Sequence, residues 1–449
     1  MTVNASPEPR APFFRSPGFK LLLIVALTIA MAVPLFFVQL TLAEREGRAQ
    51  EAAIDIATGW GGSQIVAGPV LFVPYETTEQ EIVDTHMVQT TQRQTAVLLP
   101  TALNISAHAD TQERWRGIFA VPVFRSAISL HASFDGKALA SAAPAGAHVL
   151  WNEAYASVQI ADVRGLAGNI QLDVNGTKQA FEPGVGVDGS NAPGIHAPLA
   201  LSSVPDQLDL QTDIPLRGSR ELSFAPLGKE TSARLTSAWQ SPSFFGDFLP
   251  GARRIGADGF DATWDVPYLA RGMAQNFTSP ENALNSLFGS TFGVRFYRPV
   301  DFYQLVQRSL KYAMLFLGLS FLVFFVAELV AGRRLHAVQY TLIGAAQVLF
   351  YLLLLSLAEH IGFLAAYALA AGATVAVTGL YAMSAFASAM RALVLSLVLG
   401  GLYALLYVIL IQEDYALLIG TGVLFAALAT TMFMTRRIDW SRVAAPSAS

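Results

Sequence analysis

Five long apolar stretches follow one another in the C-terminal third of the chain, and they constrain the fold more than any other feature. A hydrocarbon core about 30 Å thick needs roughly 20 apolar residues in a helix, which each stretch supplies. The loops between them are so short that each helix should return antiparallel beside the one before it. The predicted spans are residues 312–331, 338–357, 361–383, 392–411 and 415–435.

A sixth apolar stretch, residues 21–42, lies near the N-terminus and has two interpretations. Ala30-Met31-Ala32 would suit cleavage of a signal peptide. The apolar run nevertheless continues through Val38, whereas the core of a signal peptide has only about 7–15 residues. A retained first span is therefore favoured, and Pro34 should bend this helix without ending it.

Basic residues close to the spans predict the orientation of the chain, because lysine and arginine in short loops stay in the cytoplasm. The two short loops on the opposite side contain Glu359-His360 and Gln412-Glu413-Asp414, without lysine or arginine. Both termini are therefore expected in the cytoplasm, as tails at residues 1–20 and 436–449. The basic residues on the cytoplasmic side are Arg10, Arg15, Lys20, Arg333, Arg334, Arg391, Arg436, Arg437 and Arg442.

Residues 43–311 separate the first span from the second and are expected outside the cytoplasm, in the periplasm of a Gram-negative cell. Short segments rich in β-branched and aromatic residues predict many strands and a sandwich-like β fold. About 270 residues is large for one sandwich, which favours two packed lobes, with residues 183–198 as the candidate junction. The chain has no cysteine, so this domain must be held together by its hydrophobic core.

Glu328 is the clearest charged residue within a predicted span, and intramembrane charges are functional candidates by default. It lies near the cytoplasmic end of its helix, close in sequence to Arg333 and Arg334. The simpler interpretation, which we favour, is an interfacial carboxylate that pairs with these two arginines.

Four polar residues of the outer loops face the predicted external domain: Glu359, His360, Glu413 and Asp414. Together they would form a proton-sensing or cation-binding cluster. Glu413 and Asp414 also stand at the start of the last span, where a carboxylate caps free amides and meets the positive end of the helix dipole. Capping and solvation of the loops are therefore favoured over a site.

Motifs for catalysis are absent from the sequence. None of the histidines forms an HExxH or HxH pair, and neither a GxSxG elbow nor a GxxxxGK phosphate loop is present. Thiolate catalysis and cysteine zinc sites are excluded because the chain has no cysteine. We therefore expect no catalytic residue, no metal ion and no cofactor. The net charge of −4 gives no reason to expect nucleic acid as a partner.

The apolar bundle has features of an anchor. Its five helices contain no proline, although broken helices usually mark the substrate site of a transporter. Small residues four apart in the stretch at 361–383 predict a packing seam between helices, since they let backbones approach closely. These residues are Gly362, Ala366, Ala370, Thr374 and Thr378.

Several long segments, beginning with Trp60-Gly61-Gly62-Ser63-Gln64, resemble the CreD family of bacterial envelope-integrity proteins. The resemblance extends over nearly the whole chain and is least distinct between about residues 135 and 215. It implies a protein of the bacterial inner membrane, often controlled by the CreBC two-component system, with a role in tolerance to colicins or β-lactams. It implies no reaction, cofactor or active site. The other matching segments are residues 68–74, 116–123, 237–244, 248–250, 308–312, 336–340, 356–363, 413–418 and 436–440.

Three functions are weighed. The leading one is a non-enzymatic envelope protein, whose external domain binds a periplasmic protein or a cell-wall component and whose helices lie in the lipid bilayer. The alternative is a transporter or channel for a small envelope-related solute. The third is an enzyme with a dispersed site in the external domain, since catalytic groups need to be close only in space. Neither the partner nor the oligomeric state can be derived from the residues.

Overall fold

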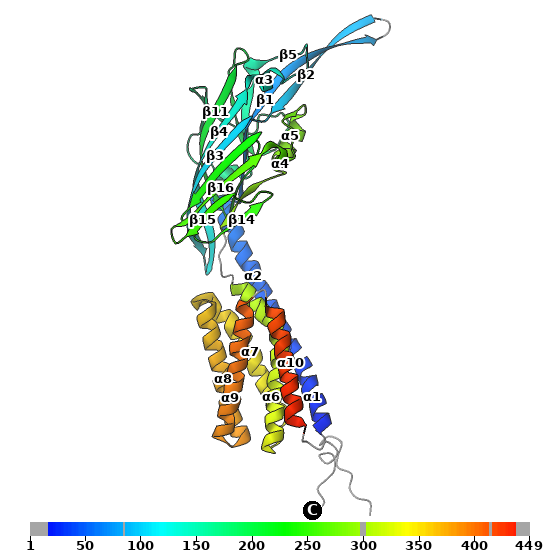
Figure 1. Ribbon diagram of the computed structural model, residues 1–449, viewed down its shortest axis with the longest axis vertical. Helices are drawn as coiled ribbons and strands as arrows, with labels where there is room; N and C mark the ends of the chain where they lie inside the picture. Colours follow the sequence, from blue (N-terminus) through cyan, green and yellow to red (C-terminus); the bar gives the residue numbers. More distant parts are fainter. Residues whose placement is uncertain (1–16, 84–85, 297–301, 413–414, 437–449) are drawn as a thin grey trace, which may run out of the picture. The chain divides into compact units, whose positions relative to one another are not determined.

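The computed structural model describes residues 17–83, 86–296, 302–412 and 415–436. These residues belong to two compact units (Figure 1). The helical unit comprises the chain up to Arg48 and from Val300 onward, and the β unit comprises Ala49–Pro299. The helix α2 begins in the helical unit, and its last turns belong to the β unit.

The apolar stretches near both ends of the chain are helices, as predicted. Within the described residues, five helices are long and apolar enough to cross a membrane, and α10 contains a shorter apolar segment, Leu417–Phe433. Such helices contact the lipid bilayer. In hydrocarbon, only helices and closed β-barrels satisfy all of their backbone hydrogen-bonding groups. The first of the five, Phe19–Trp60, consists of α1 and α2 together. The bounds are α1 (Pro17–Ala30), α2 (Ala32–Trp60), α6 (Phe302–Ala331), α7 (Ala337–Ile361), α8 (Phe363–Phe386), α9 (Ala389–Ile411) and α10 (Ala416–Thr435).

The N-terminal helix is interrupted at one residue, Met31, between α1 and α2. Pro34 causes this interruption, because it lacks the amide hydrogen that would bond to the carbonyl of Ala30. The Met31 amide still donates to the Leu27 carbonyl at 3.0 Å, and the Leu35 amide donates to the Met31 carbonyl at 3.2 Å. Pro34 thus disturbs the helix locally without ending it, as predicted.

The predicted packing seam of α8 is confirmed at four of its five positions. Ala366, Ala370, Thr374 and Thr378 are buried, and α8 lies against both α7 and α9. Gly362 instead precedes the helix, with a φ of 78°. Small side chains therefore allow close approach of the neighbouring helices along most of α8.

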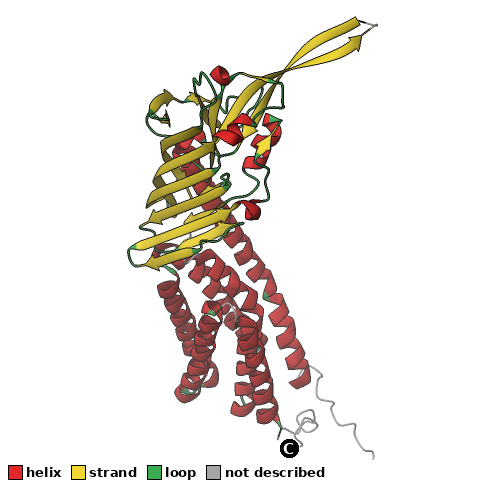
Figure 2. Cartoon of the chain, turned by 45° about the horizontal axis from the view of Figure 1, so that its top comes forward, coloured by secondary structure: helices red, strands yellow, loops and turns green. Residues whose placement is uncertain are grey.

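The β unit contains two sheets and three short helices, α3 (Gly136–Ala140), α4 (Tyr268–Arg271) and α5 (Pro280–Leu287). The ten-stranded sheet has the order β14-β18-β12-β1-β6-β10-β9, with β2 and β5 paired to β1 and β17 paired to β2. The strands β1 and β2 form a long hairpin that extends beyond the other strands (Figures 1 and 2). The bounds are β1 (Gln64–Val83), β2 (His86–Leu98), β5 (His148–Val149), β6 (Tyr155–Ile160), β9 (Glu182–Pro183), β10 (Gly194–Pro198), β12 (Glu221–Phe224), β14 (Pro242–Gly246), β17 (Asn276–Phe277) and β18 (Phe292–Phe296).

The eight-stranded sheet has the order β15-β16-β13-β3-β4-β11-β7-β8 (Figure 2). Buried and exposed residues alternate along β3 and β11, so one face of this sheet lies on the core and the other faces solvent. The bounds are β3 (Ala102–Arg116), β4 (Phe119–Asp135), β7 (Gln171–Val174), β8 (Thr177–Ala180), β11 (Gln207–Ser219), β13 (Glu230–Ser237), β15 (Ala252–Gly256) and β16 (Gly259–Pro267).

Both sheets contribute to one hydrophobic core, which confirms the sandwich-like fold. Leu71 and Phe72 of β1 belong to the same buried cluster as Leu103 and Ile105 of β3. The favoured division into two lobes is therefore wrong. Residues 183–198 are not a junction, because β9 and β10 in this segment pair with each other and β10 pairs with β6. Because the strands are long, a single hydrophobic core extends through the whole domain. The length of the chain alone could not indicate this.

Candidate functional site

A buried polar cluster links three helices at one end of the helical unit. Glu328 of α6 forms an ion pair with Lys20 of α1, and its side chain is only 6% exposed. The Tyr340 hydroxyl of α7 donates to the other Glu328 oxygen at 3.1 Å. Lys20 Nζ also donates to the Leu335 carbonyl at 2.8 Å. Each charged group thus has a specific partner, as a buried ion pair requires.

The partner of Glu328 is not the one that the sequence suggested. The ion pair that the structure describes for Glu328 is with Lys20, so the predicted pairing with Arg333 and Arg334 is wrong. Arg333 and Arg334 lie beyond the end of α6 at Ala331, after Gly332 with a φ of 65°, so the spacing of residues along a helix does not bring them beside Glu328. Glu328 was therefore identified from its charge. Its partner Lys20 was missed because Lys20 lies on another helix, far away in the chain.

A second cluster uses α6 and α7 in reversed roles, with α2 in place of α1. Glu359 near the end of α7 lies 3.6 Å from a guanidinium nitrogen of Arg45 on α2. The Tyr303 hydroxyl of α6 donates to Glu359 at 3.1 Å. In the first cluster α6 supplies the carboxylate and α7 the tyrosine, whereas here α7 supplies the carboxylate and α6 the tyrosine. The two clusters together fix the N-terminal helix to α6 and α7.

Two residues of the predicted outer cluster, Glu359 and His360, lie within the described residues. The exposed ring of His360 has its Nδ1 3.0 Å from the Ser356 carbonyl of its own helix, while Glu359 is held by Arg45 and Tyr303. Glu413 and Asp414 lie outside the described residues. Their predicted capping role thus stays a prediction, and so does a joint site with Glu359 and His360.

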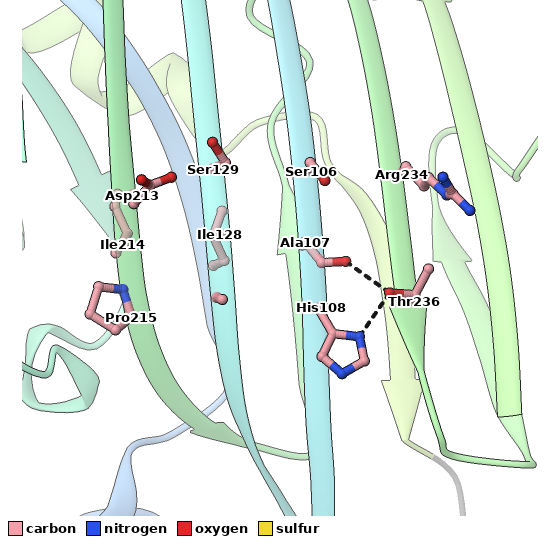
Figure 3. A pocket seen from close by; sticks show the side chains of 11 residues that line it. Ser106, Ala107, His108, Ile128, Ser129, Asp213, Ile214, Pro215, Arg234 and Thr236 are labelled. Atoms are coloured by element: carbon pink, nitrogen blue, oxygen red, sulfur yellow. Dashed lines mark hydrogen bonds between the residues drawn. The ribbon is translucent and has the colours of Figure 1, made fainter. Parts of the chain in front are cut away.

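The exposed face of the eight-stranded sheet carries a depression of 720 Å³ that sequence reasoning missed. Figure 3 shows Asp213, Ser129, Ser106 and Arg234 in one row across four strands, in agreement with the strand register. We call this depression the trough. Its remaining lining residues are Ala107, His108, Ala127, Ile128, Ile214, Pro215 and Thr236. Small side chains lie between a carboxylate and a guanidinium, and only the register of β3, β4, β11 and β13 assembles them.

Two charged side chains, Asp213 and Arg234, lie at the two ends of the row that lines the trough. The Arg234 guanidinium makes two hydrogen bonds to Asp261, of 2.7 and 3.1 Å, and these hold the pKa of the Asp261 carboxyl below its usual value. At the other end of the row, no ion pair is described for Asp213. Three strand spacings, about 14 Å, separate β11 from β13. A ligand in the trough therefore meets the Asp213 carboxylate at one end and the Arg234–Asp261 ion pair at the other.

The trough lacks the geometry of a catalytic triad. His108 Nδ1 lies 2.9 Å from the Thr236 hydroxyl, which is the distance between a base and a nucleophile. The carboxylate that lines the trough is Asp213, and β4 lies between its strand and that of His108, a separation of about 10 Å. Asp213 therefore cannot orient His108. Within the described residues, no group of three His, Asp or Glu side chains could hold a metal ion.

Comparison with known proteins gives matches over almost the full length. The family model described as "Inner membrane protein CreD" matches residues 16–441. The curated "Inner membrane protein CreD" of Escherichia coli (strain K12) is 32% identical over 442 residues, which cover 96% of each chain.

Proposed function

The chain belongs to the CreD family of inner membrane proteins, and from this premise we propose that it supports the integrity of the cell envelope without being an enzyme. Its external domain, predicted at residues 43–311, binds a periplasmic protein or a cell-wall component. Its helices anchor this domain in the inner membrane, with both termini in the cytoplasm.

The trough is the observation that supports a binding role. Its volume of 720 Å³ lies within the range of about 300–1,000 Å³ that is usual for binding sites. Ser106 and Ser129 form its floor between Asp213 and Arg234. Serine hydroxyls donate and accept hydrogen bonds, so this surface suits a polar ligand such as a glycan or an extended peptide.

The two buried clusters support an anchoring role for the helices over transport. Glu328 and Glu359 are the buried carboxylates of the described spans, and each already has a cation and a tyrosine as partners. A transport path needs polar groups that can exchange partners with a solute or an ion. Paired carboxylates at the two ends of the same helices instead stabilise one arrangement.

Complementation of a deletion strain tests this proposal, with sensitivity to detergent, colicin and β-lactam as the readout. The double variant Ser106→Trp/Ser129→Trp fills the trough and should lose complementation, while its membrane level and melting temperature stay close to wild type. Thr177→Trp, at an exposed position of β8 in the same sheet, is the matched control and should complement fully. Full complementation by the double variant would exclude the trough as the binding surface.

A further inference from the structure

Two arginines stand directly opposite each other on neighbouring strands of the eight-stranded sheet. Arg125 of β4 and Arg217 of β11 are partners in the antiparallel register. Like charges in directly opposed positions destabilise a sheet. Both side chains line a second pocket of 500 Å³, together with Leu166, Ala167 and Gly168. The pocket therefore concentrates positive charge where two opposed side chains repel each other.

A third arginine adds to this charge around the ring of Trp60, the last residue of α2. The guanidinium carbons of Arg114, Arg125 and Arg217 lie 3.8, 5.1 and 5.4 Å from the ring centroid. The ring offers each cation a weak attraction. The C-terminal end of a helix contributes about half a negative charge. These contributions do not neutralise three guanidinium groups.

The nearby carboxylates do not supply the missing negative charge. Asp55 pairs with Arg116 at 2.8 Å, and Asp162 pairs with Arg164 at 2.8 Å. Asp110 is opposite Arg125 in the register with β3, yet the described residues contain no ion pair between them. In addition, Arg217 Nε is buried without a hydrogen-bond acceptor in the described part of the chain. An external anion would pair with both guanidinium groups and accept the hydrogen bond from Arg217 Nε.

We propose that this pocket binds a phosphate group of an envelope molecule, a proposal that rests on the ligand-binding role of the external domain. Guanidinium groups match phosphate oxygens in a two-pronged geometry. A phosphate monoester carries about −1.5 to −2 charges at pH 7, which balances Arg125 and Arg217, whereas a carboxylate would leave one of them uncompensated. Pro215 lines both this pocket and the trough, so one extended ligand reaches both.

Titration calorimetry of the purified full chain with inorganic phosphate, at constant ionic strength, tests the site. Arg125→Gln and Arg217→Gln should each weaken phosphate binding at least tenfold, and acetate should bind at least tenfold more weakly than phosphate. Arg253→Gln is the matched control. Arg253 lies on β15 of the same eight-stranded sheet, and it also lies over an aromatic ring, that of Phe244 in the other sheet. Equal phosphate affinity in the wild type, Arg125→Gln and Arg217→Gln would overturn the proposal.

Two further measurements distinguish a loss of phosphate binding from a loss of folding. The unliganded Arg125→Gln protein should melt no lower than wild type, since one of two opposed like charges is removed. If it fails to fold, Arg125→Lys keeps the charge without the planar fork and should still weaken phosphate binding.

Glucose 6-phosphate and phosphatidate in mixed micelles then distinguish a sugar phosphate from a lipid headgroup as the source. Failure of phosphate binding leaves the complementation result for Ser106→Trp/Ser129→Trp unchanged, so the two proposals fail separately.

Discussion

Lys20 and Glu328 form an ion pair although 308 residues separate them in the chain. The side chain of Lys20 is 19% exposed and that of Glu328 is 6% exposed, so both charges are largely removed from solvent. Their pairing joins α1 to α6, and Tyr340 adds α7. The stability of the helical unit therefore depends on these specific polar contacts as well as on apolar packing.

Removing one partner of this pair should destabilise the helical unit strongly. A single Glu328→Met or Lys20→Met substitution leaves a buried charge alone, which costs about 3–5 kcal/mol. The double variant replaces both charges with apolar side chains and should recover most of that loss. Unfolding of the purified chain in mixed micelles measures the difference as a double-mutant cycle. Additive losses would contradict the pairing, and Arg333→Gln serves as a control that should change little.

The second cluster should contribute less to stability. Glu359 is 4% exposed, but Arg45 is 40% exposed and lies 3.6 Å from it, and Glu359 keeps the hydrogen bond from Tyr303 when Arg45 is replaced. An ion pair in contact with solvent contributes at most about 1 kcal/mol, and salt weakens it further. Arg45→Gln should therefore cost clearly less stability than Lys20→Met in the same unfolding measurement. Tyr303→Phe removes the 3.1 Å hydrogen bond to Glu359 and should cost about 1 kcal/mol. A loss for Arg45→Gln equal to that for Lys20→Met would refute this ranking.

Asp162 should make the β unit sensitive to acid. The hydrogen bond from the Arg164 side chain, and next those from the Gly62 and Arg164 amides, lower the pKa of this carboxyl. A lowered folded pKa gives stability that is present above the unfolded value of about 3.9 and is lost as pH falls through the folded pKa.

Acid titration of the melting temperature tests this prediction. Between neutral pH and roughly pH 2, wild type should lose more stability than Asp162→Asn. Arg164→Gln should lie between them, since its side chain gives the largest effect. Identical acid profiles for wild type and Asp162→Asn would count against the prediction.

Trp264 should be the most costly single position in the β core. Its side chain is 1% exposed, and its indole N–H donates to the Phe248 carbonyl at 3.2 Å. Trp264→Ala opens a cavity and should destabilise the unit by about 3–5 kcal/mol. Trp264→Phe fills part of that cavity but leaves the carbonyl unpaired, so its loss should be smaller. Chemical denaturation of both variants gives the comparison, and equal losses would show that packing contributes little here.

The spans and the fold class could be predicted because each depends on a local pattern. A run of roughly 20 apolar residues forms a helix in a bilayer. The bend near Pro34 was predicted because proline has no amide hydrogen to donate. The β-rich unit followed from short segments of β-branched and aromatic residues. These patterns do not say which strands pair, so the common core of the two sheets was missed and two lobes were favoured.

The site residues were partly accessible from the sequence. Glu328 and Glu359 stood out because few charged residues occur near the spans, but their partners Lys20 and Arg45 lie on a helix that is distant in the chain. The opposition of Arg125 and Arg217 exists only in the register of β4 with β11. The alternation of buried and exposed residues along β11 excludes a shift of that register by one residue, but it does not say that β11 pairs with β4 and leaves shifts by two residues open.

The 308 residues between Lys20 and Glu328 also set a delay during synthesis. At about 5–20 residues per second, a ribosome needs roughly 15–60 s to travel from one residue to the other. Throughout that interval the lysine is in place while its carboxylate partner has not been made. A chain that terminates before α6 keeps this lysine unpaired, so it differs chemically from a finished copy. The ion pair therefore forms only after α6 has been made, and the hydrogen bond from Tyr340 is added later still, with α7.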